Sequence, residues 1–153
     1  IANARCIVLI GSHIGENLHN AQVQTLAEAI DNDVTLITVD PRFSVPASKS
    51  KHWLPIKPGT DLALLLAWMH VLIEEELYDR EFVEKWTVGF EDLKKAVAPY
   101  HAERVAEITW LTPDQAAALH APIDQIANGK SHVRFIGRQS PFVQRIPHAR
   151  PYV

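Results

Sequence analysis

The sequence predicts an α/β domain, in which a parallel sheet begins with a βαβ unit and several short helices follow. Two apolar runs rich in β-branched residues, 5–10 and 34–39, are separated by a pattern of helical period over residues 21–30. The composition agrees with this fold class, because 47% hydrophobic and 22% charged residues in a chain of 153 are typical of one globular core.

The first run, Arg5–Ile10, is continuously apolar after Arg5 and stops at Gly11, as expected of a strand that is buried on both faces of a parallel sheet. Apolar positions recur at helical spacing up to Ile30, where a polar Asp-Asn-Asp turn ends the helix. The second strand ends at Asp40-Pro41. Together these segments form a Rossmann-like βαβ unit, for which a right-handed crossover is expected.

Residues 40–59 contain four prolines and predict a loop that is long for a compact domain. A long ordered loop at the carboxyl end of a strand is often functional. The alternative is a surface excursion with a short edge strand around residues 53–56.

Several helices follow that loop. Thr60-Asp61 opens a helix to about Glu76 whose apolar residues surround it, which predicts burial on every side. Short amphipathic helices are predicted over 79–86, 91–97 and 103–108. Residues 112–115, Thr-Pro-Asp-Gln, form a capping-box signature for a further helix. A last strand is predicted over 132–136.

Cysteine and charge content exclude several classes of function. Cys6 is the single cysteine, so a disulfide scaffold and a Cys-based zinc or iron–sulfur site within this chain are excluded.

Residues 125–153 carry a charge of +5 and residues 1–124 carry −8. Five basic residues among 29 are too few to indicate a nucleic-acid-binding surface, so no nucleic-acid partner is predicted. No apolar run reaches the length of a membrane span, so no direct membrane insertion is predicted.

Three polar segments are expected to meet at one edge of the sheet. They are residues 11–17 after the first strand, residues 40–42 after the second, and residues 58–61 before the long helix. Ligands of open α/β sheets bind outside the carboxyl ends of the strands. Glycines there let the backbone approach a phosphate, an arginine clamps it, and an aspartate accepts hydrogen bonds from a ribose or a guanine edge. The three segments together predict a site for a nucleotide-bearing cofactor.

Each segment alone also has a purely structural explanation. Asp40 can hold a turn with Pro41, and Thr60 or Asp61 can cap the following helix. The loop Gly11-Ser-His-Ile-Gly15 is not the G-x-G-x-x-G fingerprint of dinucleotide-binding proteins. Only the joint placement of the three segments favours a binding site.

A family resemblance rests on longer motifs. Gly11-Ser12 with Asn17, then Val39-Asp40-Pro41-Arg42, and above all the stretch WLPIKPGTDLAL over residues 53–64 resemble the catalytic subunit of molybdopterin oxidoreductases of the dimethyl sulfoxide reductase type. The later residues Trp86-Thr87 and Gly89-Phe90 fit the same family. The pattern looks closest to polysulfide, thiosulfate and tetrathionate reductases or to formate dehydrogenase relatives, and it covers about residues 3–115.

The resemblance implies a Rossmann-like domain that binds molybdopterin guanine dinucleotide. It places Gly11, Ser12 and Asn17 toward the pterin and pyrophosphate, Asp40, Pro41 and Arg42 at the nucleotide, and Gly59 and Asp61 at the guanine. It further implies a molybdenum enzyme that carries out two-electron redox chemistry on a small sulfur or inorganic substrate, with a 4Fe-4S cluster upstream of this segment. The partners it implies are the remainder of the catalytic subunit and an electron-transfer iron–sulfur subunit.

The predicted organisation has two parts. Residues 1–115 form the partial cofactor-binding α/β domain, and residues 116–153 form an atypical basic C-terminal segment that contains the strand at 132–136. Since the sequence starts at Ile1 and its one methionine is Met69, we expect a piece of a longer protein that is inactive in isolation. A stand-alone nucleotide-binding module and an inactive remnant are the alternatives. The compartment, periplasm or cytoplasm of a prokaryote, is left open.

Overall fold

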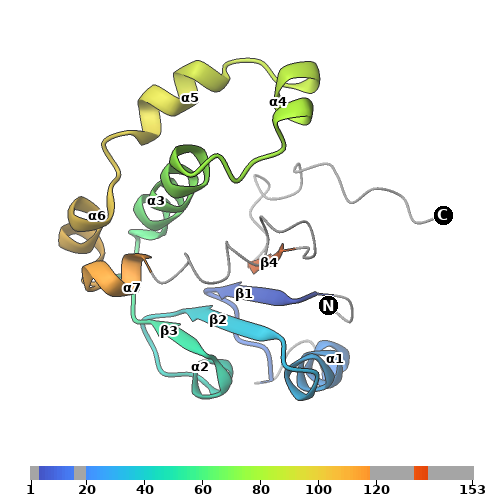
Figure 1. The fold of residues 1–153 in the computed structure, drawn as a ribbon. Coiled ribbons are helices and arrows are strands. Elements are labelled where there is room, and N and C mark those ends of the chain that lie inside the picture. The colour runs from blue at the N-terminus through green and yellow to red at the C-terminus, as the bar shows by residue number, and fades with distance from the viewer. Residues whose placement is uncertain (1–3, 16–19, 118–132, 138–153) are drawn as a thin grey trace.

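The computed structural model describes residues 4–15, 20–117 and 133–137 and contains a parallel sheet with helices on both faces (Figure 1). The sheet has the strand order β3 (His52–Leu54), β2 (Thr35–Val39), β1 (Cys6–Ile10) and β4 (Val133–Gly137). All three pairings are parallel. The predicted α/β class with a parallel sheet is therefore confirmed.

Strand β1 lies inside the sheet. It pairs with β2 on one side, where Cys6 is opposite Thr35 and Ile10 is opposite Val39, and with β4 on the other. The first four of its five residues are buried, and their side chains alternate between the two faces. The prediction of a first strand buried on both faces is confirmed.

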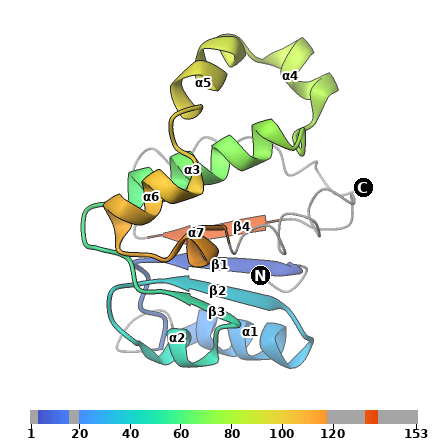
Figure 2. The same ribbon diagram turned by 60° about the vertical axis from the view of Figure 1, so that its left-hand side comes forward.

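One face of the sheet is covered by α1 (Asn20–Asp31) and α2 (Val45–Lys49), as Figure 2 shows. The buried cluster on this side joins Ile7, Leu9 and Leu36 of the sheet to Leu26 and Ala29 of α1. The apolar positions of α1 recur at helical spacing, so this helix presents one continuous stripe to the strands.

The opposite face is covered by α3 (Asp61–Glu74), whose Leu64 and Trp68 pack on Val8 and Ile37. The prediction that α3 is buried on every side was wrong, since Leu62 is 67% exposed. The helix rests on the sheet with one side, and the described residues leave part of its surface uncovered.

Four shorter helices follow α3: α4 (Arg80–Trp86), α5 (Phe90–Val97), α6 (Ala102–Thr109) and α7 (Pro113–Ala117). Helices α5 and α6 both contact α3. Figure 2 shows α5 on the side of α3 that faces away from the sheet. The predicted capping box of α7 is present, because the N–H of Gln115 donates to Thr112 Oγ1 at 3.1 Å and the N–H of Thr112 donates to Gln115 Oε1 at 3.0 Å.

The segment between β2 and α3 holds more regular structure than a loop. Ser44 caps the five-residue helix α2 by accepting a hydrogen bond from the N–H of Ala47, and β3 adds an edge strand at residues 52–54. The alternative prediction, a short edge strand around residues 53–56, is thus confirmed, and the observed strand lies one or two residues earlier in the chain. The strand predicted at 132–136 is observed as β4, whereas the division into parts 1–115 and 116–153 stays a prediction.

In the part of the chain that the structure describes, no helix has both the length and the apolar character needed to cross a lipid bilayer.

The two faces of α3 provide a matched test of its packing. We expect Leu64→Ala to lower the free energy of unfolding by about 2–5 kcal/mol, because Leu64 is 1% exposed and its removal leaves a cavity against the sheet. Leu62→Ala on the same helix should change it by less than about 0.5 kcal/mol. Urea unfolding followed by circular dichroism measures both variants, and equal losses would contradict the observed orientation of α3.

Candidate functional site

The parallel register places the carboxyl ends of β1, β2 and β3 side by side. Ile10 is opposite Val39, and Val39 is opposite Leu54. Just beyond the strands, the N–H of Gly11 donates to the carbonyl of Val39 at 3.0 Å and the N–H of Asp40 donates to the carbonyl of Leu54 at 3.2 Å. The first and second predicted segments are therefore neighbours, tied together through the backbone.

The strand order also places a topological switch point at β1. The chain leaves β1 and β2 through α1 and α2 on one face, and it leaves β3 through α3 on the other face, on its way back to β4 beside β1 (Figures 1 and 2). Because the strand order reverses its direction at β1 and the connecting helices change to the other face, all the crossovers can keep the same handedness. In open α/β sheets, ligands bind outside the carboxyl ends of the strands at such a point.

The first segment begins with Gly11 at the carboxyl end of β1. Its φ of +54° lies in the left-handed region, and no atom lies within 4 Å of the position that a Cβ would take. Gly11 is exposed, the following Ser12 is partly buried, and Ile14 anchors the loop by packing at 3% exposure in the cluster beneath α1. Asn17 lies outside the described residues. The described part of this loop thus presents open backbone at the sheet edge.

The second segment follows β2. One carboxylate oxygen of Asp40 accepts a hydrogen bond from the N–H of Arg42 at 2.8 Å, around the exposed Pro41. The indole N–H of Trp53 donates to the carbonyl of Asp40 at 2.9 Å. The structural role considered for Asp40, holding a turn, is therefore present, and it fixes the direction in which the chain leaves the sheet.

The side chain of Arg42 links the second segment to the first. Its Nη2 lies 2.6 Å from Nδ1 of His13, and the guanidinium donates to an imidazole nitrogen across the carboxyl edge. His13 is not among the residues that the sequence predicts for the site. The one signal that could have identified it is its position a few residues beyond the first strand, opposite Arg42.

The third segment forms the turn that leads into α3. Thr60 precedes the helix but does not cap it, because its hydroxyl donates to the carbonyl of Lys57 at 2.7 Å. Gly59 has a φ of +82°, and the space that a Cβ would take there is open, with no atom within 4 Å. Asp61 is partly buried in the first turn of α3, and no described residue forms a hydrogen bond or an ion pair with its carboxylate.

These groups match the chemistry of a nucleotide. Open glycine backbone suits the close approach of a phosphate, and the Arg42 guanidinium suits its charge. A carboxylate at Asp61 without a partner among the described residues can accept from two adjacent N–H donors, such as those of guanine. The residues present therefore fit a guanine-bearing cofactor.

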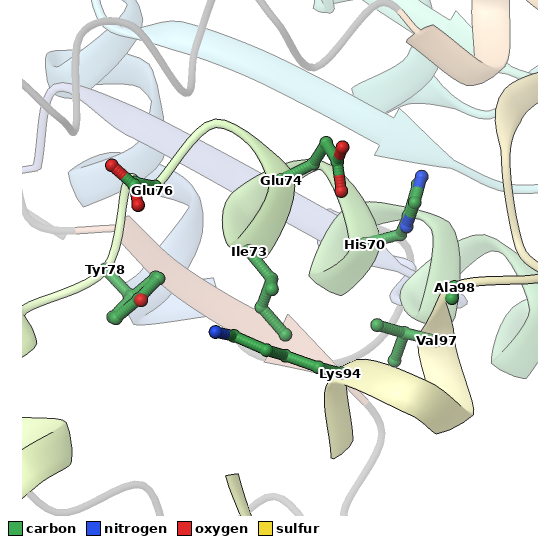
Figure 3. A pocket seen from close by; sticks show the side chains of 8 residues that line it. All are labelled: His70, Ile73, Glu74, Glu76, Tyr78, Lys94, Val97 and Ala98. Carbon is green, nitrogen blue, oxygen red and sulfur yellow. The ribbon is translucent and has the colours of Figure 1, made fainter. Parts of the chain in front are cut away.

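A hollow of about 250 Å³ lies at the carboxyl end of α3 (Figure 3). It is lined by His70, Ile73, Glu74, Glu76, Tyr78, Lys94, Val97 and Ala98. Two of its charged groups have partners nearby, since Glu76 pairs with Arg80 and Lys94 pairs with Glu91. Within the described ranges no group of three His, Cys, Asp or Glu side chains could hold a metal ion. We therefore place the candidate site at the sheet edge rather than here.

The single cysteine has no place in the site. Cys6 lies in the middle layer of the fold with no exposed surface, and burial raises the pKa of its thiol to about 11. Because the thiolate is the reactive form, Cys6 is an inert core residue.

Comparison with known proteins identifies the class. Residues 1–143 match the molybdopterin oxidoreductase family, and the chain belongs to that family. It is 43% identical over 108 residues to acetylene hydratase of Syntrophotalea acetylenica, which is 71% of this chain and 15% of that protein. It is 44% identical over 97 residues to the thiosulfate reductase molybdopterin-containing subunit of Salmonella typhimurium, which is 63% of this chain and 13% of that protein.

A solved structure agrees with the family. Acetylene hydratase from Pelobacter acetylenicus superimposes with a TM-score of 0.72 at 36% sequence identity, over 88% of this chain and 18% of that one. The present chain therefore spans less than a fifth of the length of these relatives. The resemblance inferred from the sequence motifs is confirmed at the level of the family.

The burial of Cys6 makes its reactivity a probe of the fold. We expect a thiol reagent such as 5,5′-dithiobis(2-nitrobenzoic acid) at pH 8 to label the native chain only as fast as it unfolds, because Cys6 has no exposed surface and burial raises the pKa of its thiol. Labelling should become rapid in urea above the unfolding midpoint. Fast labelling of the native chain would show that β1 is accessible.

Proposed function

We propose that this chain binds molybdopterin guanine dinucleotide at the carboxyl edge of its sheet. The residues that hold the cofactor are those of the three converging segments: Gly11, Ser12, Asn17, Asp40, Pro41, Arg42, Gly59 and Asp61. The family membership of the chain supports a molybdenum–pterin cofactor, and the donor set at the edge supports its guanine dinucleotide form.

The observation that carries the proposal is the presence of two unlike groups on the segments that follow β2 and β3. Arg42 supplies a positive charge, and its guanidinium contacts His13 at the carboxyl edge of the sheet. Asp61 supplies a carboxylate that no described residue satisfies. A purely structural edge would require neither group, whereas a guanine nucleotide has an anion for one and adjacent N–H donors for the other.

Each residue has a distinct task. The exposed backbone around Gly11 and Ser12 approaches the pterin and pyrophosphate side of the ligand. Arg42 donates to phosphate oxygens, while the turn held by Asp40 and Pro41 fixes the position of Arg42. Asp61 accepts from the N1–H and N2–H groups of guanine. When bound, the cofactor supplies the molybdenum redox chemistry, and this chain binds and orients it.

The whole subunit is proposed to carry out two-electron redox chemistry on a small sulfur or inorganic substrate. Support comes from the 44% identity to the molybdopterin-containing subunit of a thiosulfate reductase. A relative of equal similarity is named a hydratase, so we infer that residues outside this chain set the reaction type. The proposed partners are the remainder of the catalytic subunit and an electron-transfer iron–sulfur subunit.

Asp61→Asn tests the guanine contact. The amide places an N–H donor toward the donors of guanine, so we expect GDP affinity to fall about 10- to 100-fold, as for the loss of hydrogen bonds to a charged group. ADP affinity should stay unchanged. Isothermal titration calorimetry of the chain with both nucleotides measures this selectivity.

The matched control for that variant is Asp92→Asn on α5, whose exposed carboxylate lies 3.7 Å from Lys95 Nζ and belongs to no proposed contact. It should bind GDP as the parent chain does. Equal losses of GDP and ADP affinity in Asp61→Asn would remove the contact between Asp61 and guanine from the proposal.

Arg42→Gln tests the phosphate contact separately. We expect GDP affinity to fall about 10-fold and guanosine affinity to stay the same, because a charge-assisted bond to phosphate is lost and the base contact is kept. The GDP affinity of the variant should also depend less on salt concentration. Arg80→Gln on α4 is the control, and a parallel loss of guanosine binding in Arg42→Gln would argue against a phosphate role.

A further inference from the structure

Trp110 is an unusual residue for its backbone position. It follows the last residue of α6 with a φ of +66°, in the left-handed region that glycine usually occupies at the ends of helices. An aromatic side chain is strained there, and strained residues persist where the surrounding structure holds them and often mark ligand-binding sites. The side chain is also 67% exposed, so the strain is not explained by burial of the ring.

The residues on either side of Trp110 anchor its backbone. Thr109 has no exposed surface and Leu111 is 3% exposed, so the chain is anchored in the core on both sides of the exposed tryptophan. The hydroxyl of Thr109 donates to the carbonyl of Val105 at 2.7 Å and accepts from the N–H of Leu111 at 3.4 Å. The backbone that carries the indole is thus fixed by buried residues and hydrogen bonds on both sides.

This turn is attached directly to the third segment of the candidate site. The N–H of Lys57 donates to the carbonyl of Thr109 at 2.8 Å, and the Lys57 ammonium lies 5.3 Å from the centre of the Trp110 ring. The carbonyl of Lys57 in turn accepts from the N–H of Thr60, at 3.2 Å, and from its hydroxyl. A short chain of hydrogen bonds therefore connects Trp110 to the turn that presents Asp61.

From this arrangement we propose that Trp110 is a stacking platform for the guanine base, with Lys57 holding the ring and adding positive charge beside the nucleotide. The inference rests on the proposed function, because it assigns a base-stacking surface to the same site. A purine presents a flat face that an exposed, rigid indole is suited to cover. Asp61 would then read the edge of the base while Trp110 binds its face.

The experiment compares Trp110→Gly and Trp110→Phe with the parent chain, using GDP as the probe in calorimetry. Trp110→Gly should weaken GDP binding about 5- to 100-fold, the range expected for loss of one base–aromatic stack. Its unfolding midpoint should not fall, since glycine relieves the backbone strain. Trp110→Phe should retain most of the affinity, because it keeps an aromatic face. Trp86→Phe on α4, which replaces another exposed tryptophan, should bind GDP like the parent chain.

Fluorescence gives a second readout that a merely structural role would not change. GDP should quench part of the tryptophan emission of the parent chain, and this quenching should be absent in Trp110→Phe. Inorganic pyrophosphate, which has no base, should bind the parent chain and Trp110→Gly equally. Unchanged GDP affinity in Trp110→Gly would overturn the stacking role alone, whereas a parent chain that binds no GDP would overturn the proposed function together with this inference.

Discussion

The burial of β1 on both of its faces is the constraint on which the rest of the structure depends. Ile7 and Leu9 project into the cluster under α1, and Cys6 and Val8 project into the cluster under α3. A strand of this kind has no solvent side, so the sheet requires a layer of helices above and below it. Each fully buried aliphatic side chain contributes about 1.5–3 kcal/mol, and β1 concentrates several of them in five residues.

Parallel pairing around β1 also determines where a binding site can form. Every strand ends at the same edge, so residues that leave the sheet, such as Gly11 and Asp40, become neighbours although the sequence separates them. The helix α3 starts from the adjacent turn and adds Asp61. The core residues thus fix the positions of polar groups that contribute little to the core themselves, which leaves those groups available for a ligand.

Regular elements were predictable where one local pattern extends over many residues. The first two strands and α1 have such patterns, and the structure places them within about a residue of the expected bounds. Residues 40–59 were harder to predict, because α2 is five residues long and contains Pro46, so no period has room to develop. The exposure of Leu62 was also hidden, since an apolar helix does not reveal from its own residues which side meets the sheet.

The sequence by itself determined the parallel α/β fold and the family, and it predicted that the first two polar segments lie side by side, because strand ends and turn residues are local properties. Only the tertiary structure brought His13 to Arg42 and Trp110 to Lys57, and only it showed that the carboxylate of Asp61 has no partner among the described residues. These contacts join segments that lie far apart in the chain. The first contact arises from the parallel pairing of β1 with β2, and the second accompanies the packing of α6 against α3. No local pattern encodes either arrangement.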